Sequence, residues 1–152
     1  MSWSRREETA IHFPHRREVR FDPERLGRAL FKRTPWVLFA CLTGSGKNGV
    51  IPRYSDLDLA VYVEPGREKN WSDLSQIIAE AENSIDNSAE VDLGILNNAD
   101  ALFRHESLKG TILFVRPEAE ETFAEFYTRA CQDYEDYNQQ LARWRRYRQE
   151  IA

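Results

Sequence analysis

Two aspartates, Asp56 and Asp58, stand two residues apart in the segment SDLDLAVYV. Side chains on a strand alternate between its two faces, so this spacing puts both carboxylates on one face. The other face is apolar, as the buried side of a strand should be: Leu57, Leu59, Val61, Val63. Two neighbouring carboxylates repel each other unless a cation lies between them. The pair therefore predicts a site for Mg²⁺, which prefers oxygen ligands and leaves positions open for substrate phosphates.

A glycine-rich turn, TGSGKNG, precedes the aspartates, with ten residues between Ser45 and Asp56. Glycines at positions 44, 46 and 49 permit positive φ and close backbone approach, and consecutive backbone N–H groups can cradle an anion. The hydroxyl of Ser45 adds a further donor. The turn is not a Walker loop, which would need Gly in place of Cys41 and Ser or Thr in place of Asn48. We therefore expect Gly44 and Ser45 to hold phosphate while the aspartates hold metal.

A third carboxylate, Asp92, lies in the apolar segment VDLGIL, on a strand face that we expect Gly94 to keep open. A buried charge without a partner is costly. Asp92 is therefore either a third metal ligand beside Asp56 and Asp58, or an aspartate at an edge strand or helix cap. The upstream pair favours the ligand.

Alternating strands and helices position these residues. The short apolar run Trp36–Leu42 predicts a buried strand before the glycine-rich turn. A helix is expected from Asp22 and Pro23 to before Pro35, and the aspartate strand is expected to end at Pro65. A second helix, capped by Ser72, runs through Ile85 and leads to a strand at 91–96. A third helix, which packs His105, ends at Gly110 and is followed by a strand at 111–115. The pattern predicts an α/β (α+β) fold, a sheet of about four strands with helices on one side.

From about Pro117 the chain predicts one long helix, about 50 Å at 1.5 Å per residue, which outruns so small a domain. Apolar and aromatic residues recur along it with gaps of four and three, as in a heptad seam: Phe123, Tyr127, Ala130, Tyr134, Tyr137, Leu141, Trp144. Either the near half closes the core and the far half frays, or the aromatic far half docks a partner beside its arginines. Arginine and aromatic residues are typical of interface hot spots, which favours docking.

Residues 1–20 are charged and aperiodic, which predicts a flexible arm. The length of 152 residues predicts a single domain, over 21–152. A short strand around Ile11–Phe13 is the alternative for the arm, and His12 and His15 within it are expected to be solvated. The two cysteines, Cys41 and Cys131, are too few for a disulfide framework, and we expect both to be buried.

The net charge of −4 argues against direct, sequence-independent nucleic-acid binding. No apolar run is long enough to span a membrane, and the N-terminus lacks a signal-peptide core. The sequence therefore predicts a cytoplasmic protein without a membrane partner.

The spacing of Gly44-Ser45 and Asp56-x-Asp58 resembles the signature of the polymerase-β-like nucleotidyltransferases. Within that group the chain is most similar to the minimal nucleotidyltransferases (MNT) that act as antitoxins to HEPN-domain toxins. The resemblance covers the chain from about Pro35 to the C-terminal helix and implies a small mixed sheet with flanking helices. It also implies transfer of AMP from ATP to a tyrosine hydroxyl of a cognate HEPN toxin, contacted partly through the C-terminal helix.

By the same resemblance, Gly44 and Ser45 would contact the triphosphate, and Asp56, Asp58 and Asp92 would hold two Mg²⁺ ions. The family often carries a basic residue directly after Gly-Ser. This chain has Gly46 there, so charge neutralisation at the phosphates is either weaker or supplied by Lys47. Two other functions stay open, a weak or inactive antitoxin that neutralises by binding alone and a small-molecule nucleotidyltransferase.

Overall fold

The computed structural model describes residues 17–53 and 55–151. Its centre is a four-stranded sheet with the order β5-β4-β2-β6, formed by β2 (Val37–Thr43), β4 (Leu57–Val63), β5 (Val91–Ile95) and β6 (Thr111–Val115). The helices are α2 (Pro23–Arg33), α3 (Trp71–Ser84), α4 (Ala101–Leu108) and α5 (Glu120–Ile151). The order of elements along the chain follows the alternation that the sequence predicts.

The sheet is mixed. β2 pairs antiparallel with both β4 and β6, whereas β4 and β5 run parallel. The two central strands, β2 and β4, are the most buried, and this agrees with their nearly continuous apolar sequences. The turn after β2 and the starts of β4 and β5 therefore meet at one end of the sheet.

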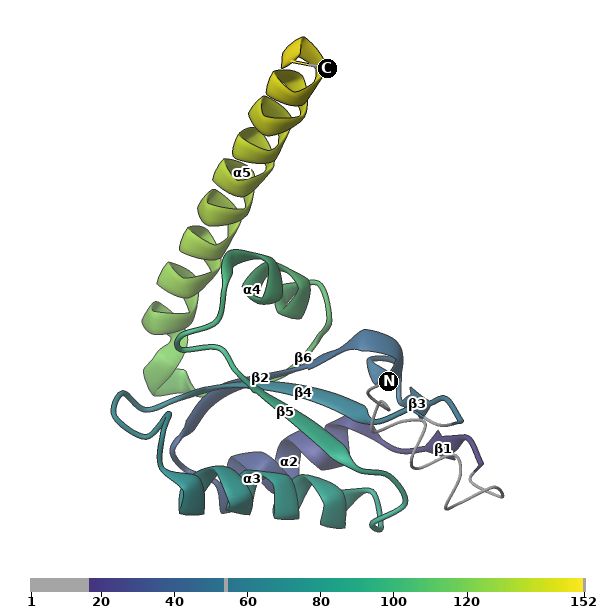
Figure 1. Cartoon of the computed structure of the whole chain (residues 1–152). Helices are drawn as coiled ribbons and strands as arrows, with labels where there is room; N and C mark the ends of the chain where they lie inside the picture. The colour runs from purple at the N-terminus through teal and green to yellow at the C-terminus, as the bar shows by residue number, and fades with distance from the viewer. Residues whose placement is uncertain (1–16, 54, 152) are drawn as a thin grey trace.

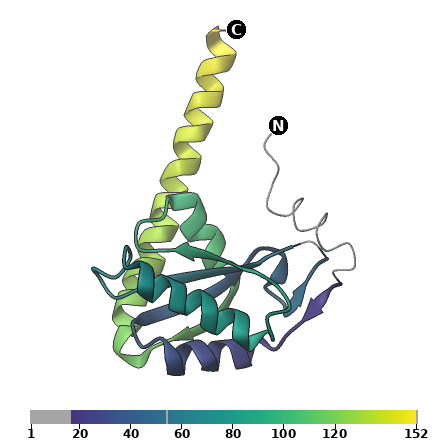
Figure 2. The same ribbon diagram turned by 60° about the horizontal axis from the view of Figure 1, so that its bottom comes forward.

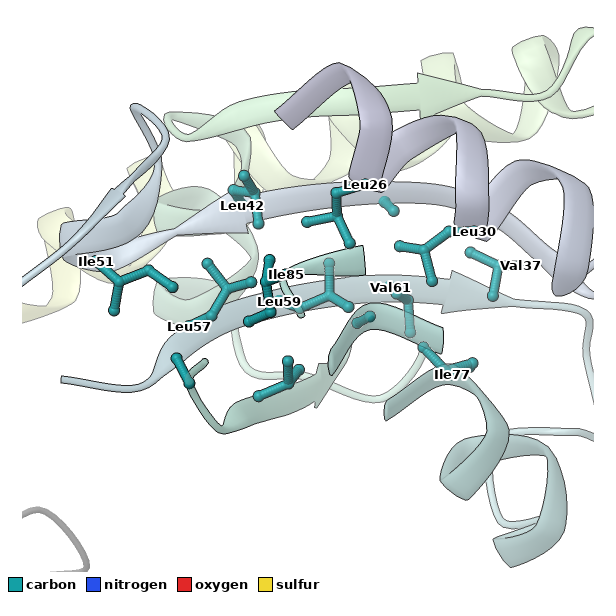
Figure 3. Close-up of a cluster of buried hydrophobic side chains, with 14 of the residues drawn as sticks. Leu26, Leu30, Val37, Leu42, Ile51, Leu57, Leu59, Val61, Ile77 and Ile85 are labelled. Carbon is teal, nitrogen blue, oxygen red and sulfur yellow. The ribbon is translucent and has the colours of Figure 1, made fainter. Parts of the chain in front are cut away.

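One face of the sheet packs against α2 and α3 (Figures 1 and 3). The alternating apolar residues of β4 point into this core, as predicted, and meet side chains from both helices, among them Leu26, Leu30 and Ile77. These side chains are fully buried. Burying a side chain of this size contributes about 1.5–3 kcal/mol, so this cluster carries much of the stability of the fold.

The opposite face packs against α4 and the first half of α5 (Figure 1). Ala60 and Tyr62 of β4 lie there with Phe39 of β2, and Phe126 of α5 closes the cluster. The rings of Phe39 and Tyr62 stack with centroids 4.8 Å apart. The expectation that helices cover one side of the sheet is thus wrong, because both faces are apolar and each needs a helical layer.

A buried arginine joins α2 to the sheet. Arg116, at the end of β6, donates hydrogen bonds from Nε to the carbonyl oxygen of Val37 and from Nη2 to those of Phe31 and Thr34. Its guanidinium also lies 4.3 Å from the centre of the Phe31 ring. Burial lowers the pKa of Arg116 from its ordinary value. The side chain fixes the end of α2 and the start of β2 against β6.

The ends of the helices follow ordinary capping chemistry. Asp22 accepts a hydrogen bond from the N–H of Glu24 at the start of α2, as expected. The cap of α3 is Asn70 and not Ser72, because the Asn70 side chain accepts from the N–H of Asp73. A 3-10 turn over Pro117–Ala119 precedes α5, so the α-helix begins three residues after the predicted start.

Strand β1 (Val19–Arg20) pairs with β3 (Val50–Ile51) in a small antiparallel ladder beside the glycine-rich turn. No sequence pattern predicts this ladder, since each strand has two residues. The last residues of the expected arm thus pair with the domain. The possible strand at 11–13 and the histidines at 12 and 15 lie outside the described residues.

The two cysteines differ in environment. Cys41 is buried in β2, and burial raises the pKa of its thiol to about 12. Cys131 is exposed on α5, so the expectation that it is buried is wrong. The reason is that Cys131 lies one residue past Ala130, outside the stripe of α5 that faces the domain.

Helix α5 is the one element that leaves the body of the molecule (Figures 1 and 2). Its 32 residues correspond to about 48 Å of helix. Only Phe126 and Ala130 are fully buried along it, and every described residue after Leu141 is exposed. No helix among the described residues combines the length and apolarity that crossing a bilayer requires.

Candidate active site

The glycine-rich turn follows β2 directly and forms a 3-10 turn, η1 (Gly44–Gly46). Gly44 has a φ of +65°, a conformation that favours glycine. A Cβ atom at this position would also collide with Oδ2 of Asp58. Both backbone strain and lack of space therefore require glycine here. The predicted phosphate turn and the predicted metal ligand thus lie in direct contact.

Strand pairing brings two of the three predicted carboxylates side by side. Asp58 is opposite Thr43 on β2 and in register with Asp92 on the parallel strand β5. Residues in register on neighbouring strands point to the same face of a sheet. Asp58 is half-buried, whereas Asp92 is exposed because β5 is an edge strand. Asp92 therefore lies on an edge strand, as one alternative expected, and it neighbours Asp58, while its role as a metal ligand stays a prediction.

Asp56 lies just before β4 rather than within it, and it is 5% exposed. Across residues 17–53 and 55–151, no three His, Cys, Asp or Glu side chains lie in an arrangement that could hold a metal ion. The carboxylates of Asp58 and Asp92 are nevertheless donors of the type that Mg²⁺ prefers, next to a turn that can hold phosphate. The carboxylates of Asp58 and Asp92 fit Mg²⁺ chemically. Asp56 is included among the predicted ligands only because of its spacing from Asp58 in the sequence.

The position directly after Ser45 leaves little room for a side chain. Gly46 is buried, and a Cβ atom there would lie 3.0 Å from Cδ1 of Leu57. A larger residue at this position would require the Leu57 side chain to shift by a few tenths of an ångström. Lys47 is exposed, and its carbonyl oxygen accepts a hydrogen bond of 2.6 Å from Oγ1 of Thr111. This bond fixes the backbone of the turn. The Lys47 amine is the basic group that follows Ser45 most closely in the sequence.

The expectation that Gly94 keeps the sheet face open is wrong. The ring of Phe103 on α4 fills the space at Gly94, where a Cβ atom would be 3.0 Å from the ring Cε1. Gly94 is small so that α4 can approach the sheet. The face is therefore closed at Gly94, and the two aspartates lie beyond the residues that α4 covers.

His105 on α4 packs as expected. Its ring stacks on Tyr134 of α5 with centroids 3.6 Å apart and an angle of 4° between the planes. The amine of Lys109 lies 5.7 Å from the centre of the same Tyr134 ring. Sequence reasoning did not predict the contact between Lys109 and α5 or the bond between Thr111 and Lys47. These contacts link segments far apart in sequence, and no local pattern signals them.

Residues 28–119 match the family described as Polymerase beta, Nucleotidyltransferase. The matched segment begins within α2 and ends just before α5, so it contains the glycine-rich turn and all three aspartates. No curated protein matches the chain.

Three solved structures are similar in fold. A chain from a mutant MntA–HpeT toxin–antitoxin complex has a TM-score of 0.62 and 18% identity, covering 87% of this chain and 100% of its own. A chain from a toxin–antitoxin structure with AMP-PNP gives 0.60 and 19%, with the same coverage. A chain from the tri-AMPylated Shewanella oneidensis HEPN toxin in complex with MNT antitoxin gives 0.55 and 17%, covering 86% of this chain and 96% of its own. At these low sequence identities, the similarity shows a shared fold only.

Proposed function

The chain belongs to the polymerase β nucleotidyltransferase family, and from this premise we propose that it transfers AMP from ATP to a tyrosine hydroxyl of a cognate HEPN toxin. One observation carries the proposal most directly. The glycine turn contacts Asp58, and Asp58 is in register with Asp92. A phosphate cradle and two carboxylates at one end of a sheet are the parts that nucleotidyl transfer needs.

In this proposal the backbone N–H groups of Gly44 and Ser45 bind the triphosphate, and Lys47 adds positive charge. Gly44 and Ser45 are exposed, so an anion can reach them without any movement of the core. Backbone donors held by a fixed turn lose little entropy on binding, which makes them suitable for orienting a phosphate. The hydrogen bond from Thr111 contributes by fixing the backbone of Lys47, two residues after Ser45.

Asp58, Asp92 and Asp56 would hold Mg²⁺, two ions by family resemblance, which would supply charge neutralisation at the phosphates. Asp92 takes the proton of the tyrosine hydroxyl, because it is the most exposed of the three carboxylates. The tyrosine oxygen forms a bond to the α-phosphorus. The bond from the α-phosphorus to the bridging oxygen breaks, and pyrophosphate leaves with that electron pair.

The partner part of the proposal is supported by the similar structures, which are described as toxin–antitoxin complexes, one of them with an AMPylated HEPN toxin. We assign part of the toxin contact to the C-terminal helix α5. The ten residues of α5 beyond Leu141 are exposed and contribute no buried side chain to the domain.

A second function, neutralisation of the toxin by binding alone, is favoured by two observations. The described residues contain no formed three-carboxylate cluster, and Gly46 replaces the basic residue that the family often has. Both would weaken the chemical step without affecting contact with the toxin.

The test is incubation of the full chain, Mg²⁺ and α-labelled ATP with a purified candidate HEPN-domain toxin. The proposal predicts label on a toxin tyrosine, located by mass spectrometry as one added adenylyl group. Asp58→Asn should reduce transfer at least about a hundredfold while the chain remains folded, because Asp58 lies at the turn and beside Asp92. A stable complex without any label would contradict AMP transfer and support neutralisation by binding.

A further inference from the structure

The stripe of α5 that faces the domain does not stop where the domain stops. Ala130 is fully buried and Tyr134 stacks on His105, so this stripe packs on α4. The positions that follow at the same spacing are Tyr137, Leu141, Trp144 and Arg148. Residues with these spacings lie on one face of a helix. We call these four residues the α5 wall.

The α5 wall projects past α4 with large side chains in solvent. Tyr137 is 41% exposed and Trp144 is 52% exposed. Trp144 also lies against Tyr147, with ring centroids 6.0 Å apart. A helix face of this kind gains no stability from its own domain. Aromatic side chains held on a rigid helix are suited to binding, because little conformational entropy is lost when they are covered.

The charge of this region differs from that of the whole chain. Residues 137–151 contain four arginines and one glutamate, whereas the net charge of the chain is −4. Among the described residues, none forms an ion pair with these arginines. By helical spacing Arg145 and Arg148 lie on the side of the wall, while Arg146 and Glu150 lie on the opposite side.

The foot of the wall is linked to the candidate active site through the end of α4. Tyr134, one turn below the wall, contacts Lys109 at the end of α4. Two residues after Lys109, the hydroxyl of Thr111 donates a hydrogen bond to the backbone carbonyl of Lys47 in the glycine-rich turn. The wall also rises from the face of the sheet that carries Asp58 and Asp92, since α4 and α5 cover that face (Figure 1).

We propose that the α5 wall docks a protein partner whose contact surface is apolar at its centre and acidic at its rim, and that this docking holds the partner over the sheet face of Asp58 and Asp92. The identification of that partner as the HEPN toxin rests on the proposed function. Acidic groups on the partner would pair with Arg145 and Arg148, and its apolar centre would cover Leu141 and Trp144. Such pairing increases specificity and the rate of association.

The same features favour a protein over other occupants. A second copy of this wall would bring further arginines and no acidic group to the shared face, because Glu150 lies on the opposite side. A nucleic-acid strand running down the helix would meet three acidic residues directly before the wall: Asp133, Glu135, Asp136. Repulsion of phosphates by these carboxylates opposes binding of RNA along α5.

The test compares matched substitutions in the full chain by the dissociation constant for the purified candidate HEPN-domain toxin. Arg148→Glu, on the wall, should weaken binding about tenfold or more, whereas Arg146→Glu, the same charge change on the opposite face, should change it by less than about threefold. Trp144→Ala should weaken binding about tenfold or more. Trp71→Ala removes a tryptophan that is 79% exposed on α3, and it should have no such effect.

Three outcomes would overturn the proposal: equal effects of the paired substitutions, dimerisation of the isolated chain that Trp144→Ala abolishes, and binding of a single-stranded RNA oligonucleotide that Arg148→Glu abolishes. Absence of a complex between the wild-type proteins would overturn it as well.

Labelled-ATP transfer separates this proposal from the proposed function. Loss of binding in the wall variants without AMP transfer by the wild type would contradict the activity only. Transfer with no effect of the wall variants would contradict the docking surface only.

Discussion

At the scale of single residues, Asp58 joins the glycine-rich turn to the neighbouring strand β5. It contacts Gly44 across the turn and neighbours Asp92 across the strand pair. A glycine with positive φ and a carboxylate in contact with it restrict each other, since neither can be enlarged or moved alone. Such a local constraint at a proposed active site is typical of residues that hold a ligand in one orientation.

Asp92 gives the first prediction, which concerns the division between binding and chemistry. Asp92→Asn should reduce turnover by about a hundredfold or more and change the dissociation constant for ATP by less than about threefold, because a proton acceptor acts in the transition state. Single-turnover transfer to the toxin and equilibrium binding of AMP-PNP measure the two quantities. Asp86→Asn, in an exposed turn after α3, is the control and should change neither. A parallel loss of binding and turnover would show that Asp92 mainly holds the nucleotide.

The sequence predicted the local backbone around these residues better than their surroundings. Residue types and spacing predicted a turn at Gly44 and a strand at Asp58, because a tight turn and an alternating strand are local properties of the chain. Spacing could not show that Phe103 fills the space at Gly94, which depends on how α4 crosses the sheet. The position of Asp56 outside the strand also depends on where β4 begins to pair with β5.

At the scale of elements, the strands and helices follow from periodicity, while the joints between them do not. The alternation in β4 and the helical spacing in α3 predicted both buried faces. Arg116 had no such signal, although its three hydrogen bonds join α2, β2 and β6. The ladder of β1 and β3 was missed for the same reason, since two residues carry no period.

Arg116 therefore gives the second prediction. Arg116→Met should lower the free energy of unfolding by about 3 kcal/mol, because it leaves buried carbonyl oxygens without donors. Arg28→Met is the control: Arg28 forms an exposed ion pair of 3.7 Å with Glu24, and its loss should cost less than about 0.5 kcal/mol. Urea denaturation followed by circular dichroism measures both. Equal stabilities of the two variants would show that water replaces the Arg116 hydrogen bonds.

At the scale of the whole molecule, the chain divides into a packed body and a helix that leaves it. The body buries both faces of the sheet, while α5 beyond Leu141 has no buried residue. The sequence predicted this division, because the seam continues past the length that a four-stranded sheet can cover. Whether the far half frays or docks is a property of the complex, which one chain's sequence does not contain.

The last prediction follows from this division and concerns truncation after Gln140. Stability resides in buried apolar contacts, so removal of residues 141–152 should lower the melting temperature by less than about 2 °C. Hydrogen exchange of the intact chain should agree, with slow exchange in β2 and β4 and the fastest helical exchange beyond Leu141. Truncation after Ala124 is the control, because it removes Phe126 and Ala130 from the core and should unfold the body at a much lower temperature. A loss of several degrees after Gln140 would mean that the wall packs against this domain, and the exposed aromatic face would then belong to the body rather than to a partner.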